Sequence, residues 1–459
     1  MHELENLFFP KNVAVIGASA EPQSIGRAVF ENFLQGSLAD NTFPVNPNHA
    51  EILGKKSYKS IKDIPAEIDL ALIVVPAKFV PQVLQECADK KTKAAIIISA
   101  GFAEIGEKKL TQQLQTIIDK NPKIRTIGPN CFGVTCPKNN LNTTFSASAK
   151  TGMPKEGTVS FLSQSGALGV AILDWMSTQE FGLSKFVSYG NAMDVDEADL
   201  LDYFSRDTDT KIITMYIEGV KEGRKFMKIA KKTSLKKPIV VLKGGVHDET
   251  HRATASHTGS LAGSTEVYEA MFRQTGIIQA KTLEELFSFA KILENEPLPK
   301  GNRVQIITNG GGFGIVTADA VLSEGMRLAQ IDEKIKKVLR KTFPPTVTIA
   351  NPLDLVGDAD EKRYSLAINK ALQDKNVDII MVLVLFNTPA IDTGIVTELK
   401  KIRQKAKKPI LVVTIGSHYT QQRRHELEQA GIITFAYPNV AARGIRALSD
   451  YAQFKKKHA

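Results

Sequence analysis

Short runs of apolar, mostly β-branched residues alternate with longer amphipathic stretches along the whole chain. Three of these runs, residues 95–99, 379–385 and 410–415, are apolar almost throughout, which is typical of strands covered on both faces of a sheet. The alternation therefore predicts an α/β protein with parallel sheets and helices on both sheet faces. We expect strands at Val13–Ile16, Thr42–Asn46, Leu70–Val75, Ala94–Ser99, Ile124–Ile127, Thr158–Leu162, Lys185–Ser188, Ile212–Ile217, Ile239–Lys243, Ile277–Gln279, Val304–Thr308, Ile379–Leu385, Ile410–Thr414 and Ile432–Phe435.

Two interruptions of this pattern divide the chain. Around Lys138–Glu156 the periodicity gives way to polar and small residues, and around Glu294–Gly301 two prolines and a glycine indicate a linker. A length of 459 residues fits about three domains. We expect a Rossmann-like domain at residues 1–137, followed by two flavodoxin-like doubly wound domains at residues 150–294 and 301–459.

The second and third domains open on similar segments. Residues 159–170 (VSFLSQSGALGV) align with residues 304–315 (VQIITNGGGFGI) at a constant offset of 145. In both, a strand leads through a turn of small polar residues and glycine into a helix. The alignment predicts two related units, each with a helix N-terminus able to receive an anion. Glycine-rich turns between strand and helix are common in α/β proteins, so a chance match is the alternative.

Composition limits the class of protein. Hydrophobic residues make up 43% and charged residues 24% of the chain, as in ordinary globular proteins. An odd count of three cysteines indicates a reducing compartment, and the spacing of Cys131 and Cys136 is poor for zinc. The acidic N-terminus and the absence of long apolar stretches predict a cytoplasmic protein without signal peptide or membrane span. The net charge of +10 suits nucleic acid or a polyphosphate ligand.

The first turn predicts a phosphate-bearing ligand. Gly17 follows the first strand and permits a tight turn whose N–H groups face a phosphate, as in Rossmann folds. The turn lacks the middle glycine of G-x-G-x-x-G, and no acidic residue ends the second strand, so NAD is disfavoured. Later strand ends meet in the same crevice of a parallel sheet. The cofactor-binding residues that we expect there are Gly17, Ala18, Ser19, Ser24, Gly26, Val75, Pro76, Ser99, Ala100, Gly101, Phe102, Asn130 and Cys131.

One segment concentrates histidine among small residues. His247, His251 and His257 fall within eleven residues, but glycine and serine argue against a firm helix and no H-E-x-x-H pattern is present, so we expect no metal. His257 lies in the run SHTGSLAGS, which leaves its ring room to reach a reactive group. A neutral imidazole is a competent nucleophile toward phosphorus once a neighbour fixes its tautomer. Glu218, at the end of the strand Ile212–Ile217, is a candidate for that neighbour, or else it begins the next helix.

The motifs together resemble a known family. Their order is GASA from Gly17, SAGF from Ser99, GPNC from Gly128, SQSG from Ser163 and YIEG from Tyr216, and SHTGSLAGS, NGGGFG and NPLDL follow. This order resembles the α subunit of the ADP-forming acetyl-CoA (acyl-CoA) synthetases, in the succinyl-CoA synthetase superfamily. The resemblance implies that the first domain binds coenzyme A. It also implies that His257 is the phosphorylated histidine and Glu218 the glutamate that stabilises it, and that phosphate is held by Ser163, Gln164, Ser165, Gly166, Asn309, Gly310, Gly311 and Gly312.

The resemblance further implies a reaction and a partner. Phosphate would attack acyl-CoA to give an acyl phosphate and free CoA, His257 would take the phosphoryl group and release the acid, and ADP would then be phosphorylated. The chain has no ATP-grasp domain, so ADP or ATP with Mg²⁺ is expected on a separate β subunit, in an α2β2 heterotetramer. Acetyl, branched-chain and aryl acyl groups, ADP or GDP as acceptor, and either direction of the reaction are all compatible with the sequence.

Three other functions compete with this one. A non-catalytic CoA-binding regulator would need neither His257 nor Glu218. A nucleic-acid-binding protein would explain the charge, but its lysines occur without a recognisable RNA- or DNA-binding pattern. A dehydrogenase is weakened by the missing ribose-binding acid. We therefore expect an acid–thiol ligase that binds neither nucleic acid nor membrane.

Overall fold

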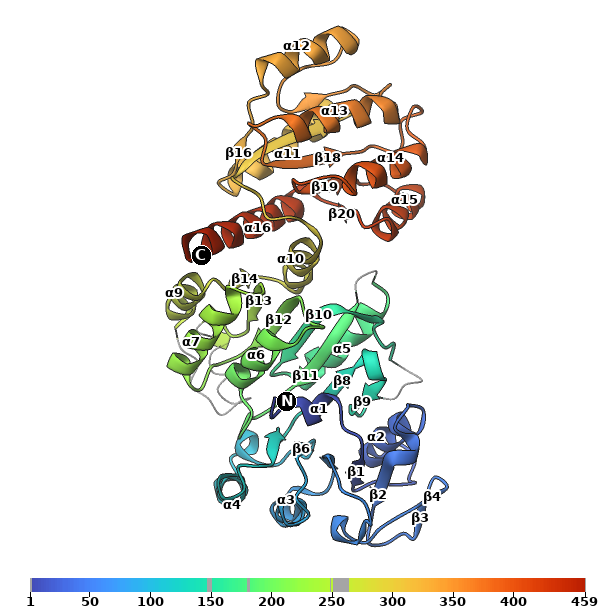
Figure 1. Ribbon diagram of the computed structural model, residues 1–459, viewed down its shortest axis with the longest axis vertical. Coiled ribbons are helices and arrows are strands. Elements are labelled where there is room, and N and C mark those ends of the chain that lie inside the picture. The colour runs from blue at the N-terminus through green and yellow to red at the C-terminus, as the bar shows by residue number, and fades with distance from the viewer. Residues whose placement is uncertain (1, 147–150, 180–181, 248, 251–263, 459) are drawn as a thin grey trace. The chain divides into compact units, whose positions relative to one another are not determined.

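The computed structural model describes residues 2–146, 151–179, 182–247, 249–250 and 264–458. The chain divides into two compact units, Met1–Lys281 and Thr282–Ala459, each built on parallel sheet covered by helices (Figure 1). The division falls just before helix α10 (Leu283–Asn295), ahead of the proline-containing stretch that the sequence suggested as a linker.

The first sheet of the first unit is parallel and has the order β2-β1-β5-β6-β7. Its strands are β1 (Val13–Ile16), β2 (Thr42–Val45), β5 (Leu70–Ile73), β6 (Ala94–Ile97) and β7 (Arg125–Ile127), with helices α1 (Glu5–Phe8), α2 (Ile25–Leu34), α3 (Val80–Asp89) and α4 (Lys108–Lys120) and the hairpin β3 (Glu51–Ile52) and β4 (Lys55–Lys56). Alternate residues of β1 enter different cores: Val13 and Val15 face one, Ala14 and Ile16 the other. Both faces are therefore covered, as the apolar runs predict.

The second sheet of this unit has the order β14-β13-β12-β10-β11-β8-β9. Its elements are β8 (Gly133–Cys136), β9 (Leu141–Asn142), β10 (Glu156–Ser163), β11 (Leu183–Ser188), β12 (Ile212–Ile217), β13 (Ile239–Lys243) and β14 (Ile278–Ala280), with α5 (Gly166–Ser177), α6 (Glu197–Arg206), α7 (Gly223–Ser234) and α9 (Thr265–Thr275). Taken from β10 onward, the parallel strands have the flavodoxin-like order 2-1-3-4-5. The hairpin β8–β9 adds two antiparallel strands at one edge.

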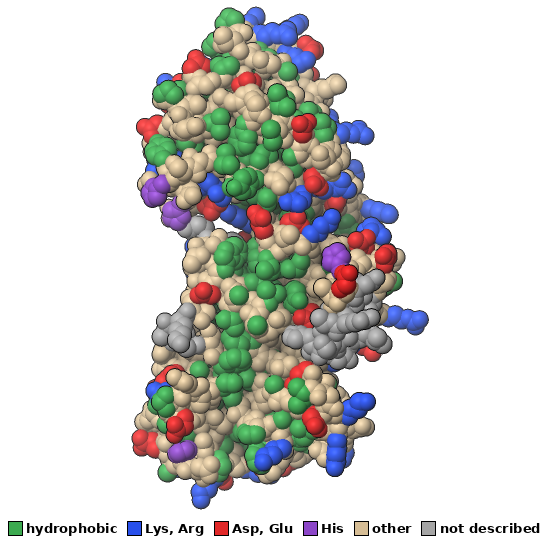
Figure 2. Space-filling model, turned by 180° about the vertical axis from the view of Figure 1, so that it is seen from behind, with side chains coloured by type: hydrophobic (Ala, Val, Ile, Leu, Met, Phe, Trp, Pro, Cys, Tyr) green, Lys and Arg blue, Asp and Glu red, His purple; other side chains and the backbone are tan. Residues whose placement is uncertain are grey.

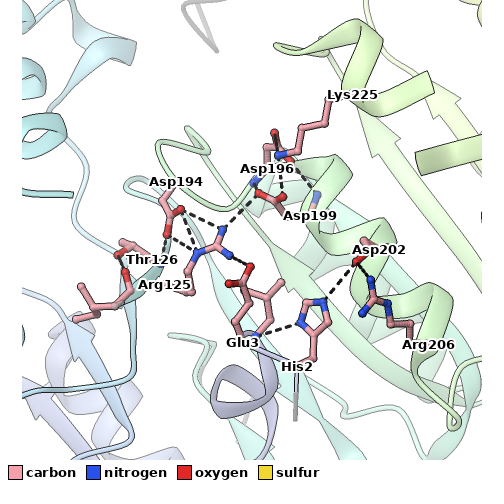
Figure 3. Close-up of polar contacts among 12 residues, drawn as sticks. His2, Glu3, Arg125, Thr126, Asp194, Asp196, Asp199, Asp202, Arg206 and Lys225 are labelled. Atoms are coloured by element: carbon pink, nitrogen blue, oxygen red, sulfur yellow. Dashed lines mark hydrogen bonds and ion pairs between the residues drawn. The ribbon is translucent and has the colours of Figure 1, made fainter. Parts of the chain in front are cut away.

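A network of charged side chains joins the two sheets of the first unit (Figure 3). Arg125 on β7 bonds Asp194 with its Nε at 3.1 Å and approaches Asp199 at 3.4 Å. The backbone N–H of Thr126 donates to the same Asp194 carboxylate at 2.6 Å. Lys225 of α7 completes the network with a 2.7 Å ion pair to Asp199. The network therefore ties the end of the first sheet to the loop and helix that follow β11.

The loop after β11 also lies against the turn after β7. The N–H groups of Asn191 and Met193 donate to the carbonyls of Pro129 and Gly128 at 2.9 and 3.1 Å. Gly190 has a φ of +55°, and a Cβ there would collide with the carbonyls of Pro129 and its neighbour. Only glycine fits this close approach. A segment of the second sheet thus supports a turn that belongs to the first.

The second unit contains one parallel sheet of flavodoxin-like order, β16-β15-β18-β19-β20, with β17 also paired to β15. Its elements are β15 (Arg303–Thr308), β16 (Arg327–Leu328), β17 (Leu353–Asp354), β18 (Ile379–Leu383), β19 (Ile410–Val413) and β20 (Ile433–Phe435), with α10, α11 (Gly311–Ser323), α12 (Glu333–Thr342), α13 (Glu361–Gln373), α14 (Gly394–Arg403), α15 (His418–Gln429) and α16 (Pro438–His458). The predicted α/β class and both flavodoxin-like sheets are confirmed.

The predicted strands all exist. Three have the predicted ends, and the others differ by one or two residues at an end. The short strands β3, β4, β8, β9, β16 and β17 were not predicted. The largest difference concerns the polar stretch at 138–156, because β9 and the start of β10 lie within it. The side chain of Thr143 fixes this region by accepting from the N–H of Val134 at 2.7 Å, a tertiary bond that no periodicity reveals.

The charged side chains on one face of the molecule are mixed in sign. On the face shown in Figure 2, lysine and arginine side chains are scattered and acidic side chains lie among them. Solvated helix faces account for such a distribution better than a nucleic-acid site does. Among the described residues, no helix is both long enough and apolar enough to cross a bilayer.

Candidate functional site

A pocket of about 700 Å³ opens at the carboxyl ends of strands from both sheets of the first unit. Two helices begin at its wall, α2 and α5, and each is capped by a serine. The hydroxyl of Ser24 accepts from the N–H of Arg27, and that of Ser165 accepts from the N–H of Leu168. A helix N-terminus attracts anions through its N–H groups and its dipole. The pocket therefore presents two anion-receptive ends.

Most of the predicted cofactor-binding residues line this pocket, together with part of the SQSG turn. The predicted residues in its wall are Gly17, Ser19, Ser24, Gly26, Val75, Ser99, Ala100, Asn130, Cys131, Gln164, Ser165 and Gly166. The pocket lining does not include Ala18, Pro76, Gly101, Phe102 or Ser163. The residues that line it without having been predicted are Ile25, Val74, Ile98, Phe132, Phe145, Ala167 and Val170. Their apolar side chains carry no chemical signal in the sequence.

The turn after β1 is held from the next strand. The N–H of Gly17 donates to the carbonyl of Val45 at 2.9 Å, and the amide of Asn46 donates to the carbonyl of Ala18 at 2.9 Å. A φ of +92° at Gly17 requires glycine. Asn46 stands at the end of β2, where a dinucleotide-binding protein has an acidic residue, and here it supports the turn.

A chain of amides and a carboxylate supports Asn130 in the pocket wall. The side-chain amide of Asn130 donates to Asn191 at 3.3 Å, and the amide of Asn191 donates to Glu104 at 2.6 Å. The same carboxylate accepts from the N–H groups of Gly101 and Phe102 at 2.5 and 3.1 Å. These bonds keep the pKa of Glu104 below its usual value although burial opposes them. Glu104 and Asn191 thus fix two pocket turns at once, and neither was predicted.

Asn191→Ala should weaken binding of coenzyme A, the ligand that the resemblance implies for this pocket. Loss of a hydrogen bond of about 1 kcal/mol on the Asn130 side chain should raise the dissociation constant of CoA roughly fivefold. Calorimetric titration with CoA measures this constant. Asn121→Ala is the matched control, because Asn121 bonds its own helix and Gln85. Equal effects of the two substitutions would contradict the prediction.

Gln164 connects the pocket to Glu218. Its Oε1 accepts from the N–H groups of Glu218 and Gly219, the latter at 3.0 Å, and its Nε2 donates to the carbonyl of Gly219 at 3.0 Å. Gln164 therefore holds the backbone of Glu218 in place beside the N-terminus of α5. Helix α7 begins at Gly223, so the alternative that Glu218 begins the next helix is wrong.

The Glu218 side chain is 6% exposed and bonded by a neighbour. The hydroxyl of Tyr216 donates to Glu218 Oε1 at 3.2 Å. Burial, and then the charge of Glu218, raise the pKa of Tyr216, so this hydroxyl stays a donor. Lys243 lies over the ring of Tyr268 at 4.8 Å, and its pKa is lowered by burial while the charge of Glu218 opposes the shift. The carboxylate thus lies in a buried, polar surrounding.

His257 lies outside the described residues, but both ends of its segment are described. The segment leaves β13, whose last residue Lys243 pairs with Ile217, next to Glu218. The hydroxyl of Thr265, at the start of α9, donates to the carbonyl of Val246 at 2.7 Å. The two ends of the segment are therefore fastened together, and the segment leaves β13 next to the strand that ends before Glu218.

The second unit repeats the turn geometry at the predicted offset of 145. Ser163 Oγ accepts from the N–H of Ser165 and donates to its carbonyl, and Thr308 Oγ1 does the same with Gly310. Asn309 bonds the backbone of Leu385 with both ends of its amide, at 2.9 and 3.2 Å. The two turns therefore share this hydrogen-bond geometry at the predicted spacing. Leu385 stands where the first unit has Glu218, so the repeat lacks a carboxylate there.

Neither metal binding nor thiol chemistry is indicated by the described residues. Within the described ranges, no group of three or more His, Cys, Asp and Glu side chains is arranged to hold a metal ion. The thiol of Cys131 lies in the pocket wall and donates to the carbonyl of Ile97 at 3.2 Å, while burial raises its pKa to about 12. This thiol therefore stays protonated and unreactive at neutral pH.

Three families match successive parts of the chain. A family described as CoA binding domain matches residues 11–137, the succinyl-CoA ligase like flavodoxin domain matches residues 156–293, and the Ligase-CoA domain matches residues 304–453. Together they cover most of the sequence.

Relatives match over nearly the full length of this chain. The chain is 42% identical to the alpha subunit of acetate–CoA ligase [ADP-forming] II of Pyrococcus furiosus over 457 residues, 98% of each chain. It is 39% identical to acetate–CoA ligase [ADP-forming] I of Archaeoglobus fulgidus, covering 99% of this chain and 64% of that relative. The structure of the dinucleotide forming acetyl-coenzyme A synthetase 1 of Ca. Korarchaeum cryptofilum, in complex with phosphate and ADP, matches with a TM-score of 0.91 and 35% identity, over 100% of this chain and 99% of that chain.

Proposed function

The chain belongs to the ADP-forming acetate–CoA ligases, and on that premise we propose how it works: as the subunit that binds CoA and carries the phosphorylated histidine, His257. The reaction converts acyl-CoA, phosphate and ADP to carboxylic acid, CoA and ATP. One observation carries the proposal. The N-termini of α2 and α5 open on a single pocket, and Gln164 links that pocket to the buried carboxylate of Glu218.

The two helix ends suit two different anions. The N-terminus of α2, with Gly17 and Ser19 beside it, suits the phosphates of CoA, and the N-terminus of α5 suits inorganic phosphate. A phosphate oxygen attacks the acyl carbonyl carbon, the C–S bond breaks, and CoA leaves with the sulfur. The N–H groups at α5 and the amide of Asn130 face the charge that develops on the oxygens.

The phosphoryl group then moves to the histidine. A neutral imidazole nitrogen of His257 attacks phosphorus and the carboxylate leaves, so the acid is released. Glu218 accepts a hydrogen bond from the other ring nitrogen, which fixes the tautomer and stabilises the positive ring. The hydroxyl of Tyr216 donates to the same carboxylate. The phosphohistidine finally passes its phosphoryl group to ADP.

ADP phosphorylation requires a partner. Some relatives continue for about another third of their length beyond the part that this chain matches, as the 64% coverage of the Archaeoglobus chain indicates. We propose that a separate ATP-grasp β subunit supplies the ADP or ATP site with its Mg²⁺, in a cytoplasmic α2β2 heterotetramer. Three domains, 1–137, 150–294 and 301–459, divide the work of this chain into CoA binding, phosphohistidine and a second phosphate-holding turn at Asn309, Gly310, Gly311 and Gly312.

The test combines this chain with its β partner. Acyl-CoA and labelled phosphate should give an acid-labile phosphoprotein, and addition of ADP should move the label to ATP and release CoA. A chain that binds CoA without taking up label in any acyl-CoA mixture would instead be a CoA-binding regulator. The buried Glu218 beside the pocket favours the enzyme, because a regulator gains nothing from a buried carboxylate there.

Glu218→Gln should lower phosphohistidine formation about 10- to 150-fold, since a hydrogen bond to a charged group contributes about 1.5–3 kcal/mol. CoA affinity should stay within twofold, because the substitution leaves the pocket wall intact. Label incorporation and CoA titration measure the two quantities. Glu222→Gln, an exposed position four residues on, is the control. If Glu218→Gln were labelled as strongly as the wild type, the carboxylate of Glu218 would have only a structural role.

A further inference from the structure

The turn after β12, residues 218–221, is held at all four backbone N–H groups by side chains from other elements. Gln164, in the turn before α5, accepts from the first two of these groups. The third donates to the hydroxyl of Tyr268 on α9 at 3.0 Å. The fourth, that of Lys221, donates at 3.3 Å to the buried carboxylate of Glu197, the first residue of α6. Three elements therefore fix the backbone of this turn.

The side chain of Lys221 extends from this turn to the loop after β11. Its ammonium donates to the backbone carbonyls of Asn191 and Ala192 at 2.6 and 2.9 Å. Ala192 has a φ of +49°, in the left-handed region that a residue with a Cβ rarely adopts. Such a conformation persists only where the surroundings hold it, and the two bonds from the ammonium contribute to that hold. Lys221 therefore anchors a strained loop to a fixed turn.

The anchored loop in turn supports the pocket wall. The side chain of Asn191 accepts from the amide of Asn130 at 3.3 Å, and its backbone N–H donates to the carbonyl of Pro129 at 2.9 Å. Its own amide donates at 2.6 Å to Glu104, whose carboxylate also holds the turn after β6. A displacement of the backbone at 191–192 would therefore be passed to Asn130, which lines the pocket.

From this chain of contacts we propose that Lys221 is a positioning residue for the CoA half of the site and acts through Asn191. The fixed turn holds the ammonium, the ammonium holds the loop, and the loop holds Asn130. The inference rests on the proposed function, in which this pocket binds CoA. The turn keeps its four backbone bonds without the ammonium, so the phosphohistidine half of the site does not depend on the Lys221 side chain.

The test measures the two halves of the site separately, in the complex with the β subunit. Lys221→Met keeps an unbranched side chain but removes the donor, so the dissociation constant of CoA should rise roughly fivefold, as in Asn191→Ala. Calorimetric titration with CoA measures this constant. Labelled ATP, supplied without CoA, should phosphorylate Lys221→Met at a rate within about twofold of the wild type. Labelling at that rate also shows that the variant is folded.

Lys237→Met is the matched control, because the ammonium of Lys237 also donates to two backbone carbonyls, those of Phe204 and Asp207. These carbonyls lie at the C-terminal end of α6, whereas Glu197 begins the same helix. Lys237→Met should therefore leave the dissociation constant of CoA unchanged. Lys221→Arg keeps a charged donor and should recover most of the CoA affinity that Lys221→Met loses.

The double variant Lys221→Met/Asn191→Ala tests the route through Asn191. Two residues that act in series do not add, so its dissociation constant for CoA should rise roughly fivefold, where independent effects would multiply to about 25-fold. Multiplied effects, a CoA affinity of Lys221→Met within about twofold of the wild type, or an equal loss of labelling from ATP would overturn the inference while the proposed function stood. A wild-type complex that neither binds CoA nor is labelled by ATP would overturn the proposed function itself.

Discussion

Replacing His257 with alanine will abolish phosphorylation of this subunit and leave CoA binding within twofold of the wild type. The imidazole is the proposed phosphoryl acceptor, and alanine offers no nucleophile in its place. The proposed CoA site consists of pocket residues that the substitution leaves unchanged. Label incorporation from acyl-CoA and labelled phosphate measures the first effect, and calorimetric titration with CoA measures the second.

His247 provides the control for this experiment. It lies in the same segment and is exposed, and its N–H bonds the hydroxyl of Thr250. His247→Ala should therefore keep normal labelling. If His257→Ala were still labelled, another residue would be the phosphoryl acceptor. If both variants lost the label, phosphorylation would depend on the conformation of the segment rather than on one imidazole.

Replacing Lys185 with methionine will destabilise the first unit by about 3–5 kcal/mol, as expected when one member of a buried ion pair is removed. The Lys185 side chain is fully buried, and its ammonium lies 2.8 Å from Asp207 and 3.4 Å from Asp209. It also lies 5.3 Å from the ring of Phe9. Methionine preserves most of the packing, so the loss isolates the cost of leaving Asp207 buried without its cation.

The single tryptophan, Trp175, lies on α5 of the first unit, and its fluorescence reports unfolding of that unit in urea. Lys55→Met is the control. The Asp40 side chain of the Lys55–Asp40 ion pair is exposed to solvent, so this pair should contribute less than about 1 kcal/mol to the free energy of unfolding. The double variant Lys185→Met/Asp207→Leu should recover most of the lost stability. A loss below about 1 kcal/mol in the single variant would mean that water reaches Asp207.

The sequence predicts most of the strands because parallel strands that are buried on both faces consist of continuous apolar runs. Ile212–Ile217 and Ile239–Lys243 have the predicted ends for this reason. The strands that were missed are two to four residues long. One of them, β8, is held by a side chain outside the strand, because Thr143 accepts from the N–H of Val134. No local pattern encodes such a bond.

The candidate site likewise contains residues that the local sequence predicts and residues that only tertiary contacts reveal. Gly17 and Asn130 could be predicted, because turns at strand ends have a recognisable composition and a common location. Gln164 could be placed at the turn, but its bonds to the backbone of Glu218 join residues 54 apart in sequence. Glu104 and Asn191 have no distinguishing context in the sequence, and only the contacts between the two sheets reveal what they support.

The bond between Thr265 and Val246 limits how far the phosphorylated group can travel. His257 is separated from Thr265 by 265 − 257 = 8 residues. Fully extended chain spans at most about 3.5 Å per residue, so the Cα atom of His257 lies no more than about 28 Å from that of Thr265 at the start of α9. In the proposed assembly, the partner subunit must therefore present its nucleotide within that distance plus the length of one histidine side chain.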